Sequence, residues 1–415
     1  MSPRRFVRML FLWSFIWPAY NAQAGIITSG DNTNSVVNNA GSGDTSCWGD
    51  NSSGGVGDGG SEPYDTRPIQ TTVPFGATSV SFGTEHACAV YSGSIYCWGD
   101  NSSSQCGQNS VTTPEVTTPT QVPNITDAVQ VAAGSGFTCY LSSTGKVYCW
   151  GADIYGQLGD GPHLTRGVTT LHLVSLPKGH VAKIVAGGFH ACANLTSGVW
   201  CWGLNNQGQL GHGDNLTYNA PVSVTWGTGF TSNTTDIDAG NDYTCSITTG
   251  APAPNNNYNL WCWGSGTDGQ TAYGIDSNVP HTPMSSSFHP TVDGIATSKG
   301  GHHTCVTASG AMWCTGENDS GQLGDNSTSN TSGFVSVSGL SSGVQAISVG
   351  QSHTCAFTNS GANLMCWGSN AVGQLGDQTT TSQLAPTTYV CGWGCNCNGT
   401  CDTGETTTNC PADCP

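Results

Sequence analysis

Histidine is the residue type in this chain that most readily suggests metal binding or acid–base chemistry, because imidazole ligates metals and titrates near neutral pH. Four His and two aromatic residues share one place in successive parts of the chain, each two residues before a Cys. They are His86, Phe137, His190, Tyr243, His303 and His353. Since a place that accepts Phe is not a ligand position, we interpret the four His as packed interior residues. The adjacent pair His302-His303 has no carboxylate at a recognised metal-ligand spacing.

Catalytic motifs are scarce in this sequence. Gly339-Leu340-Ser341-Ser342-Gly343 matches the pattern of a nucleophile elbow, but that motif requires a strand-to-helix turn. We expect the segment in a linker between strands and interpret the match as chance. The sequence has no His-Glu-x-x-His zinc motif and no phosphate loop ending in Lys-Ser/Thr. We therefore expect no catalytic residues.

The last 25 residues, 391–415, form a segment of different composition that holds six of the 20 Cys. Its oxygen donors are Asp402, Glu405, Asn409 and Asp413. Carboxylate and amide oxygens suit Ca²⁺, and a segment this short needs cross-links because it is too small to build a core. Two interpretations stay open: a calcium site, or a plain disulfide knot with solvated acids. We expect no other cofactor.

Composition and the amino terminus indicate the compartment and narrow the partners. The 415 residues include 9 Lys or Arg and 26 Asp or Glu, a formal charge of −17. Nucleic acid and anionic membranes are bound by clustered Lys and Arg, so neither partner is expected. Residues 1–24 contain three Arg, an apolar run too short to span a membrane, and the cleavage site Ala22-Gln23-Ala24. We predict a cleaved signal peptide, a mature charge of −20, and a protein that is secreted or on the cell surface.

A Cys-Trp-Gly triad recurs every fifty or so residues and organises the rest of the chain. Its seven copies begin at Cys47, Cys97, Cys149, Cys201, Cys262, Cys314 and Cys366, with Thr315 replacing Trp in the sixth. Each triad leads into a Gly-Gln-Leu-Gly loop or a variant of it. Four short strands per copy, without helical periodicity, predict an all-β fold. We expect a seven-bladed β-propeller of four-stranded blades over residues 25–390, plus a small disulfide-rich module at 391–415. The last strand, near 384–390, is expected to pair with the first copy and close the ring.

The Cys residues of the repeats predict their own pairing. Two Cys in each of six copies lie equally far from a hairpin turn, which places them opposite each other on neighbouring strands. The predicted disulfides are Cys88–Cys97, Cys139–Cys149, Cys192–Cys201, Cys245–Cys262, Cys305–Cys314 and Cys355–Cys366. In the first copy Asn38 aligns with the place of a partner for Cys47, and Cys106 replaces Leu in the second Gly loop. Because these departures fall in neighbouring copies, we predict that Cys47 and Cys106 bond each other.

The Trp-Gly strand end, the Gly-Gln-Leu-Gly loop and the preceding His-Thr/Ala-Cys strand resemble the regulator of chromosome condensation repeat family of seven-bladed propellers. The resemblance covers about residues 30–390 and implies the fold. Family members include a nuclear exchange factor for a small GTPase, ubiquitin-ligase proteins and secreted bacterial proteins. Export, acidity and paired Cys place this chain nearest the secreted bacterial branch and argue against the exchange role.

We expect a monomeric scaffold that binds an extracellular protein or glycan through its blade loops. The alternative is an extracellular polymer-degrading enzyme, a hydrolase or lyase, with its site at the ring centre. That alternative requires Asp, Glu or His side chains that converge there, whereas a centre lined by Ser, Thr and Gly favours binding.

Overall fold

The computed structural model describes residues 26–391 apart from 38–43, 61, 75, 162–167, 227–232, 250–258, 273–281, 286–287, 289, 359–362 and 387–389. These residues form strands β1 to β27 in seven sheets. No helix in this part of the chain is long and apolar enough to cross a bilayer. The predicted signal peptide at 1–24 and nearly all of the predicted tail module lie outside the described residues.

Each sheet is one antiparallel blade, and the blades follow the repeat copies. The strands are β1 (Ile26–Ser29), β2 (Thr33–Val37), β3 (Thr45–Asp50), β4 (Tyr64–Gln70); β5 (Ser79–Phe82), β6 (His86–Tyr91), β7 (Ser94–Asp100), β8 (Glu115–Gln121); β9 (Ala128–Ala133), β10 (Phe137–Ser142), β11 (Val147–Gly151), β12 (Val168–Leu173); β13 (Val181–Ala186), β14 (His190–Leu195), β15 (Gly198–Gly203), β16 (Tyr218–Ser223); β17 (Asn233–Ala239), β18 (Tyr243–Thr249), β19 (Leu260–Gly264), β20 (Met284–Ser285); β21 (Gly294–Thr297), β22 (His303–Ala308), β23 (Ala311–Gly316), β24 (Thr331–Ser336); and β25 (Val344–Val349), β26 (His353–Thr358), β27 (Asn363–Gly368).

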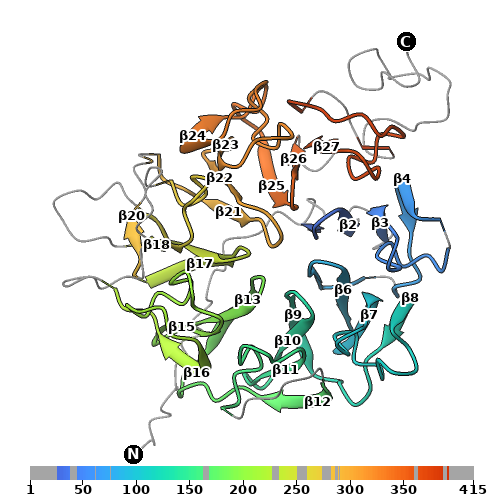
Figure 1. Cartoon of the computed structure of the whole chain (residues 1–415), viewed down its shortest axis with the longest axis vertical. Helices are drawn as coiled ribbons and strands as arrows, with labels where there is room; N and C mark the ends of the chain where they lie inside the picture. Colours follow the sequence, from blue (N-terminus) through green and yellow to red (C-terminus); the bar gives the residue numbers. More distant parts are fainter. Residues whose placement is uncertain are drawn as a thin grey trace, which may run out of the picture.

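The blades stand around a central axis in chain order, so the first blade meets the seventh (Figure 1). The first strand of every blade lines the axis. Because each blade is an antiparallel meander, its first-to-second and third-to-fourth connections lie on one face, which we call the upper face. The hairpins between second and third strands and the connections between blades lie on the lower face. The predicted all-β, seven-bladed propeller is confirmed.

Six blades carry the disulfides predicted from hairpin geometry. In blade four, for example, Cys192 pairs with Cys201 across β14 and β15, with 4.0 Å between their Cα atoms. The equivalent bonds in the other five blades join Cys88–Cys97, Cys139–Cys149, Cys245–Cys262, Cys305–Cys314 and Cys355–Cys366. Disulfides persist in oxidising compartments, so these bonds indicate an oxidising environment.

One hydrogen bond is repeated between blades. The buried Trp202 of blade four donates its indole N–H to the carbonyl oxygen of Gln157, in the Gly loop of blade three, over 2.9 Å. The other Trp–carbonyl pairs are Trp48–Gln374, Trp98–Gly55, Trp150–Gln105, Trp263–Gln209 and Trp367–Gln322. In blade six, where Trp is absent, the hydroxyl of Thr315 donates to the carbonyl oxygen of Gly269 over 3.0 Å. The triad and the Gly loop are therefore two halves of one contact between neighbouring blades.

The ring closes differently from our prediction. The segment after β27 stays on its own blade: Gln383 bridges Gly368, and the Val390 N–H donates to the Leu364 carbonyl oxygen. Blade one already draws four strands from β1 to β4, so it has no place for a strand from the other end of the chain. Side-chain and loop contacts close the ring instead, including the hydrogen bond from Trp48 to the Gln374 carbonyl oxygen.

The predicted Cys47–Cys106 bond is wrong: both side chains are buried free thiols. Ser35, not Asn38, stands opposite Cys47 in the register of β2 and β3. Cys106 sits in the Gly loop of blade two, whose carbonyl at Gln105 accepts from Trp150 of blade three. The loop therefore faces blade three. Cys47 belongs to blade one, on the opposite side of blade two. Burial raises the pKa of both thiols, which disfavours their reactive thiolate forms.

Thiol counting tests this assignment. We expect Cys47 and Cys106 to resist a thiol reagent in the native protein and to react once the protein is unfolded without reductant. The unfolded Cys106→Ser variant should then titrate with one thiol fewer than the unfolded wild type, because one of the two free thiols is gone. If the two Cys were bonded, the variant would instead titrate with one thiol more.

Candidate functional site

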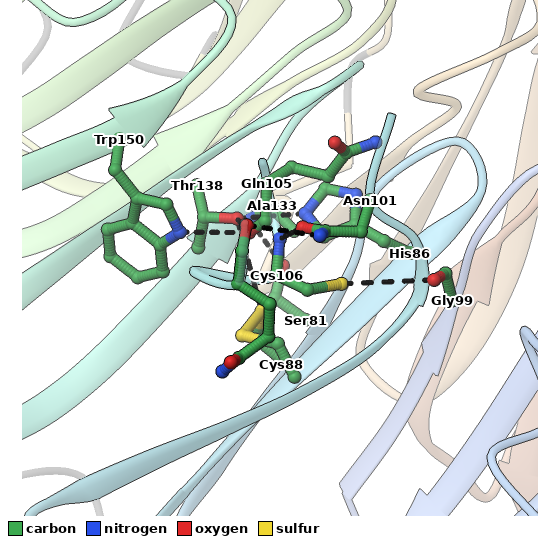
Figure 2. The surroundings of a disulfide bond; sticks show 12 residues. Ser81, His86, Cys88, Gly99, Asn101, Gln105, Cys106, Ala133, Thr138 and Trp150 are labelled. Atoms are coloured by element: carbon green, nitrogen blue, oxygen red, sulfur yellow. Dashed lines mark hydrogen bonds between the residues drawn. A yellow bond between two sulfur atoms is a disulfide. The ribbon is translucent and has the colours of Figure 1, made fainter. Parts of the chain in front are cut away.

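The repeated His residues connect blades and do not form a ligand set. The Nε2 atom of His86, in β6, lies 2.8 Å from the Thr138 hydroxyl oxygen of the next blade. That hydroxyl donates its proton to the Gln105 carbonyl oxygen, so Nε2 is the donor toward it. Figure 2 shows these groups with Trp150, whose indole reaches the same carbonyl. The equivalent pairs are His190–Thr244, His303–Thr354 and His353–Asn34. The interpretation of these His as interior residues is confirmed.

The residue that accepts this hydrogen bond varies together with its partner. Phe137 has no polar atom to offer, and the next blade carries Ala191 in β14, where blades three, five, six and seven carry Thr. Tyr243 accepts from the Thr304 hydroxyl over 3.1 Å. Comparing each copy with the following copy would have revealed this pairing in the sequence.

His302 and His303 point to different surroundings. His303 is fully buried, whereas His302 is partly exposed on the upper face. The Nδ1 atom of His302 lies 2.8 Å from Asp268 and its Nε2 atom 3.7 Å from Asp242, both from blade five. Sequence spacing missed these carboxylates because they belong to another repeat. Within the described part of the chain no group of three or more His, Cys, Asp or Glu could hold a metal ion.

The central channel is the candidate that an enzyme would need. It forms a cavity of about 230 Å³ lined by the first strands of all seven blades. Its described lining consists mostly of aliphatic, hydroxyl and amide side chains, with Asp238 as the one carboxylate and no His. Asp238 accepts from the Thr297 backbone N–H over 2.8 Å, and burial raises its pKa. Nearby, Lys183 and Asp236 form an ion pair of 2.6 Å.

Lys299 crosses this channel near the upper face. It follows β21 in blade six, yet its ammonium donates to groups of blades two and three. The acceptors are the Ser81 hydroxyl, 3.1 Å away, and the carbonyl oxygens of Phe82 and Ala133, 2.6 and 3.0 Å away. Burial lowers the pKa of Lys299 to about 8, although the negative charge of Asp238 acts to raise this pKa. All three donors of the ammonium are thus engaged, so Lys299 acts as a cross-brace.

The upper face carries a concentration of carboxylates. They lie in upper-face loops or at the strand ends that lead into them. Those of blades one, two, five and six include Asp31, Asp50, Glu85, Asp100, Asp242, Asp268, Glu317 and Asp319, and blades three and four add Asp153, Asp160 and Asp214. Among the described Lys and Arg residues, Lys299 alone comes from an upper-face loop, and its ammonium is used inside the channel. Lys146 and Lys178, by contrast, lie in lower-face connections. In the described part of the chain the upper-face loops are therefore rich in carboxylates and poor in cations.

Two other predicted sites have simple outcomes. The segment 339–343 joins β24 to β25, with Leu340 buried and positive φ at Gly339 and Gly343. It is a turn between strands, as expected, and not a nucleophile elbow. The four tail residues proposed for Ca²⁺, Asp402, Glu405, Asn409 and Asp413, lie outside the described residues.

The His–Thr pairing predicts a coupled response to mutation. Thr244→Ala removes the acceptor of His190 and should destabilise the protein by about 1–3 kcal/mol, because a buried N–H loses its partner. His190→Phe combined with Thr244→Ala reproduces the natural Phe137–Ala191 pair and should recover much of that loss. Urea unfolding of the wild type, both single variants and the double variant measures the coupling; simple additivity of the two single losses would contradict the pairing.

The same His residues predict how stability depends on pH. Burial lowers the pKa of His86, His190, His303 and His353 to about 3, whereas His in an unfolded chain titrates near about 6.5. Below that value the unfolded state binds protons that the folded state excludes. The free energy of unfolding should therefore fall as pH drops from about 6.5 toward 3, by about 1.4 kcal/mol per His and pH unit. Urea midpoints between about pH 7 and pH 5 measure this, and the double variant above should show a smaller slope.

Comparison with known proteins places this geometry in a family. Two profiles described as regulator of chromosome condensation (RCC1) repeats match residues 128–157, 181–209 and 344–374, and residues 92–141, 144–193, 197–247 and 309–357. The ultraviolet-B receptor UVR8 of Arabidopsis thaliana is 30% identical over 325 residues, which are 76% of this chain and 70% of the receptor. The E3 ubiquitin-protein ligase HERC2 of Homo sapiens is 30% identical over 281 residues, and these span 66% of this chain but 6% of the ligase.

Solved structures agree on the fold. Human WBSCR16 superposes with a TM-score of 0.72 at 20% identity, over 83% of this chain and 93% of that chain. Prp20p from Saccharomyces cerevisiae gives 0.71 at 19% identity, over 89% and 88%. With the repeat matches, the identity to UVR8 and the seven blades in agreement, this chain belongs to the regulator of chromosome condensation (RCC1) repeat family.

Proposed function

We propose that this protein works outside the cytoplasm, secreted or on a cell surface, as a rigid monomeric scaffold that binds a protein or glycan partner through its blade loops. We place it in the secreted bacterial branch of the family, with residues 391–415 as a separate Cys-rich module. Nucleic acid is not among the proposed partners, because clustered cations are what nucleic acid needs.

The observation that carries this proposal is that buried contacts hold the ring together while the exposed loops vary. The Trp, the Gly-loop carbonyl and the His–Thr pair are buried and join neighbouring blades, and a buried disulfide joins two strands within each of six blades. The loops between them differ from copy to copy and expose side chains such as Ile154 and Tyr155. A fixed frame with variable, exposed loops is suited to recognition, because little conformational entropy is lost on binding.

The channel supports binding over the enzymatic alternative. A hydrolase of glycosidic bonds ordinarily needs two carboxylates that flank its substrate. Here Asp238 accepts a backbone N–H, Asp236 is paired with Lys183, and Lys299 braces the passage. The family offers a parallel: the structure of Prp20p was described together with its binding to Gsp1p and histones.

Affinity capture tests the proposal. The full-length exported protein, immobilised on a solid support, should retain a partner from the medium or cell surface of the producing organism, and this binding should be saturable. Soluble wild-type protein should displace the partner. Hydrogen exchange should show protection in blade loops and little change in the strands. A matched Asp238→Asn variant should bind equally well. Failure to find any saturable partner, or turnover of an extracellular polymer that disappears in Asp238→Asn, would overturn the proposal.

A further inference from the structure

An exposed apolar surface lies on the upper face between blades three and four. Ile154 and Tyr155 come from the loop after β11 and are 45% and 36% exposed. The ring of Tyr155 meets that of Phe189, from the loop after β13, edge to face at a centroid distance of 5.4 Å. We call these three residues the aromatic patch. Exposed aromatic side chains that are already packed in place are common anchors of protein interfaces.

The backbone holds this patch in position. The Tyr155 N–H donates to the Gln157 side-chain oxygen over 2.8 Å, and Gln157 belongs to the buried Gly loop that accepts from Trp202. The Phe189 carbonyl oxygen accepts from the Leu204 N–H over 2.9 Å. The patch is thus tied to the contact between blades, so a partner that docks on it has little loop motion to arrest.

The chemistry of the occupant follows from the charges around the patch. Two blades away on the same face, a cavity of about 230 Å³ is lined by the carboxyl groups of Asp31, Asp50 and Glu85 together with hydroxyl and amide groups. Burial raises the pKa of Asp31 to about 7. The other carboxylates of the upper face include those of blades five and six. Lys299 is the one described Lys or Arg of the upper-face loops, and its ammonium is hydrogen-bonded inside the channel. Such a field attracts cations and repels acidic surfaces.

We propose that the upper face docks a basic protein partner, which sets an apolar side chain on the aromatic patch and a Lys or Arg side chain among Asp31, Asp50 and Glu85. This inference rests on the proposed function and assigns the binding face and the chemistry of the partner. Folding gathers the carboxylates at one face, so the docking proposed here weakens as salt rises.

A displayed library of random peptides, selected on the full-length protein, provides the probe. We expect the selected peptides to combine Lys or Arg with an aromatic or large aliphatic residue. A synthetic copy of the strongest binder should lose about tenfold or more in affinity toward Tyr155→Ser and toward Asp50→Asn with Glu85→Gln. Affinity for the wild type should also fall from low to high salt.

Val129→Ser is the matched control, because Val129 is an exposed apolar residue, 46% exposed, at the lower-face end of β9. It should leave binding unchanged. Urea midpoints equal to that of the wild type show that each variant is folded, as expected for changes at surface side chains. Selection of acidic or uncharged peptides, or binding that survives the upper-face variants, or binding that Val129→Ser abolishes, would overturn this inference.

The two proposals fail in different ways. If the capture experiment yields a partner that is bound equally by wild type and by the upper-face variants, the scaffold function stands and the docking face proposed here is wrong. If no saturable partner is captured at all, the scaffold function itself fails.

Discussion

The hydrogen bond from a Trp indole to the loop carbonyl of the preceding blade is the contact on which the architecture depends. Each indole is buried, so an unpaired N–H there would be costly, and the Gly loop can supply its carbonyl only when the blades stand at the right separation. The carbonyl at Gln105 accepts from both Trp150 and Thr138, which links one loop to two strands of the next blade. Repetition of this contact makes a ring from blades that would not be stable alone.

The same logic explains where the chain departs from its own repeat. Blade six has Thr315 in place of Trp, and its shorter hydroxyl reaches the Gly269 carbonyl oxygen. Blade one lacks a disulfide, yet Trp48 still reaches Gln374 of blade seven. The ring therefore closes through the same Trp–carbonyl contact that joins five other pairs of neighbouring blades, and no exchanged strand is needed. Both departures from the repeat keep a side-chain donor to a carbonyl oxygen of the preceding blade's Gly loop.

Because the frame is held by buried contacts, the loops of the upper face are free to differ. Their side chains bear most of the negative charge, while the channel behind them is braced by Lys299 and offers no pair of free carboxylates among the described residues. The proposed binding by the upper face is thus consistent with a purely structural role for the central channel. Six disulfides indicate an oxidising environment, in which these bonds persist and stabilise the blades.

Sequence alone determined the features whose partners lie close in the chain. The hairpin disulfides, the strand periodicity and the repeat length are local, since residues opposite each other in a hairpin are separated by a short turn. The tertiary structure decided the contacts that depend on which blade faces which and that leave no signal in the repeat: the carboxylates beside His302, the reach of Lys299 across the ring, and the isolation of Cys47 from Cys106. Spacing along the chain counts residues, whereas these contacts depend on the direction in which each loop leaves its blade, and only the closed ring sets that direction.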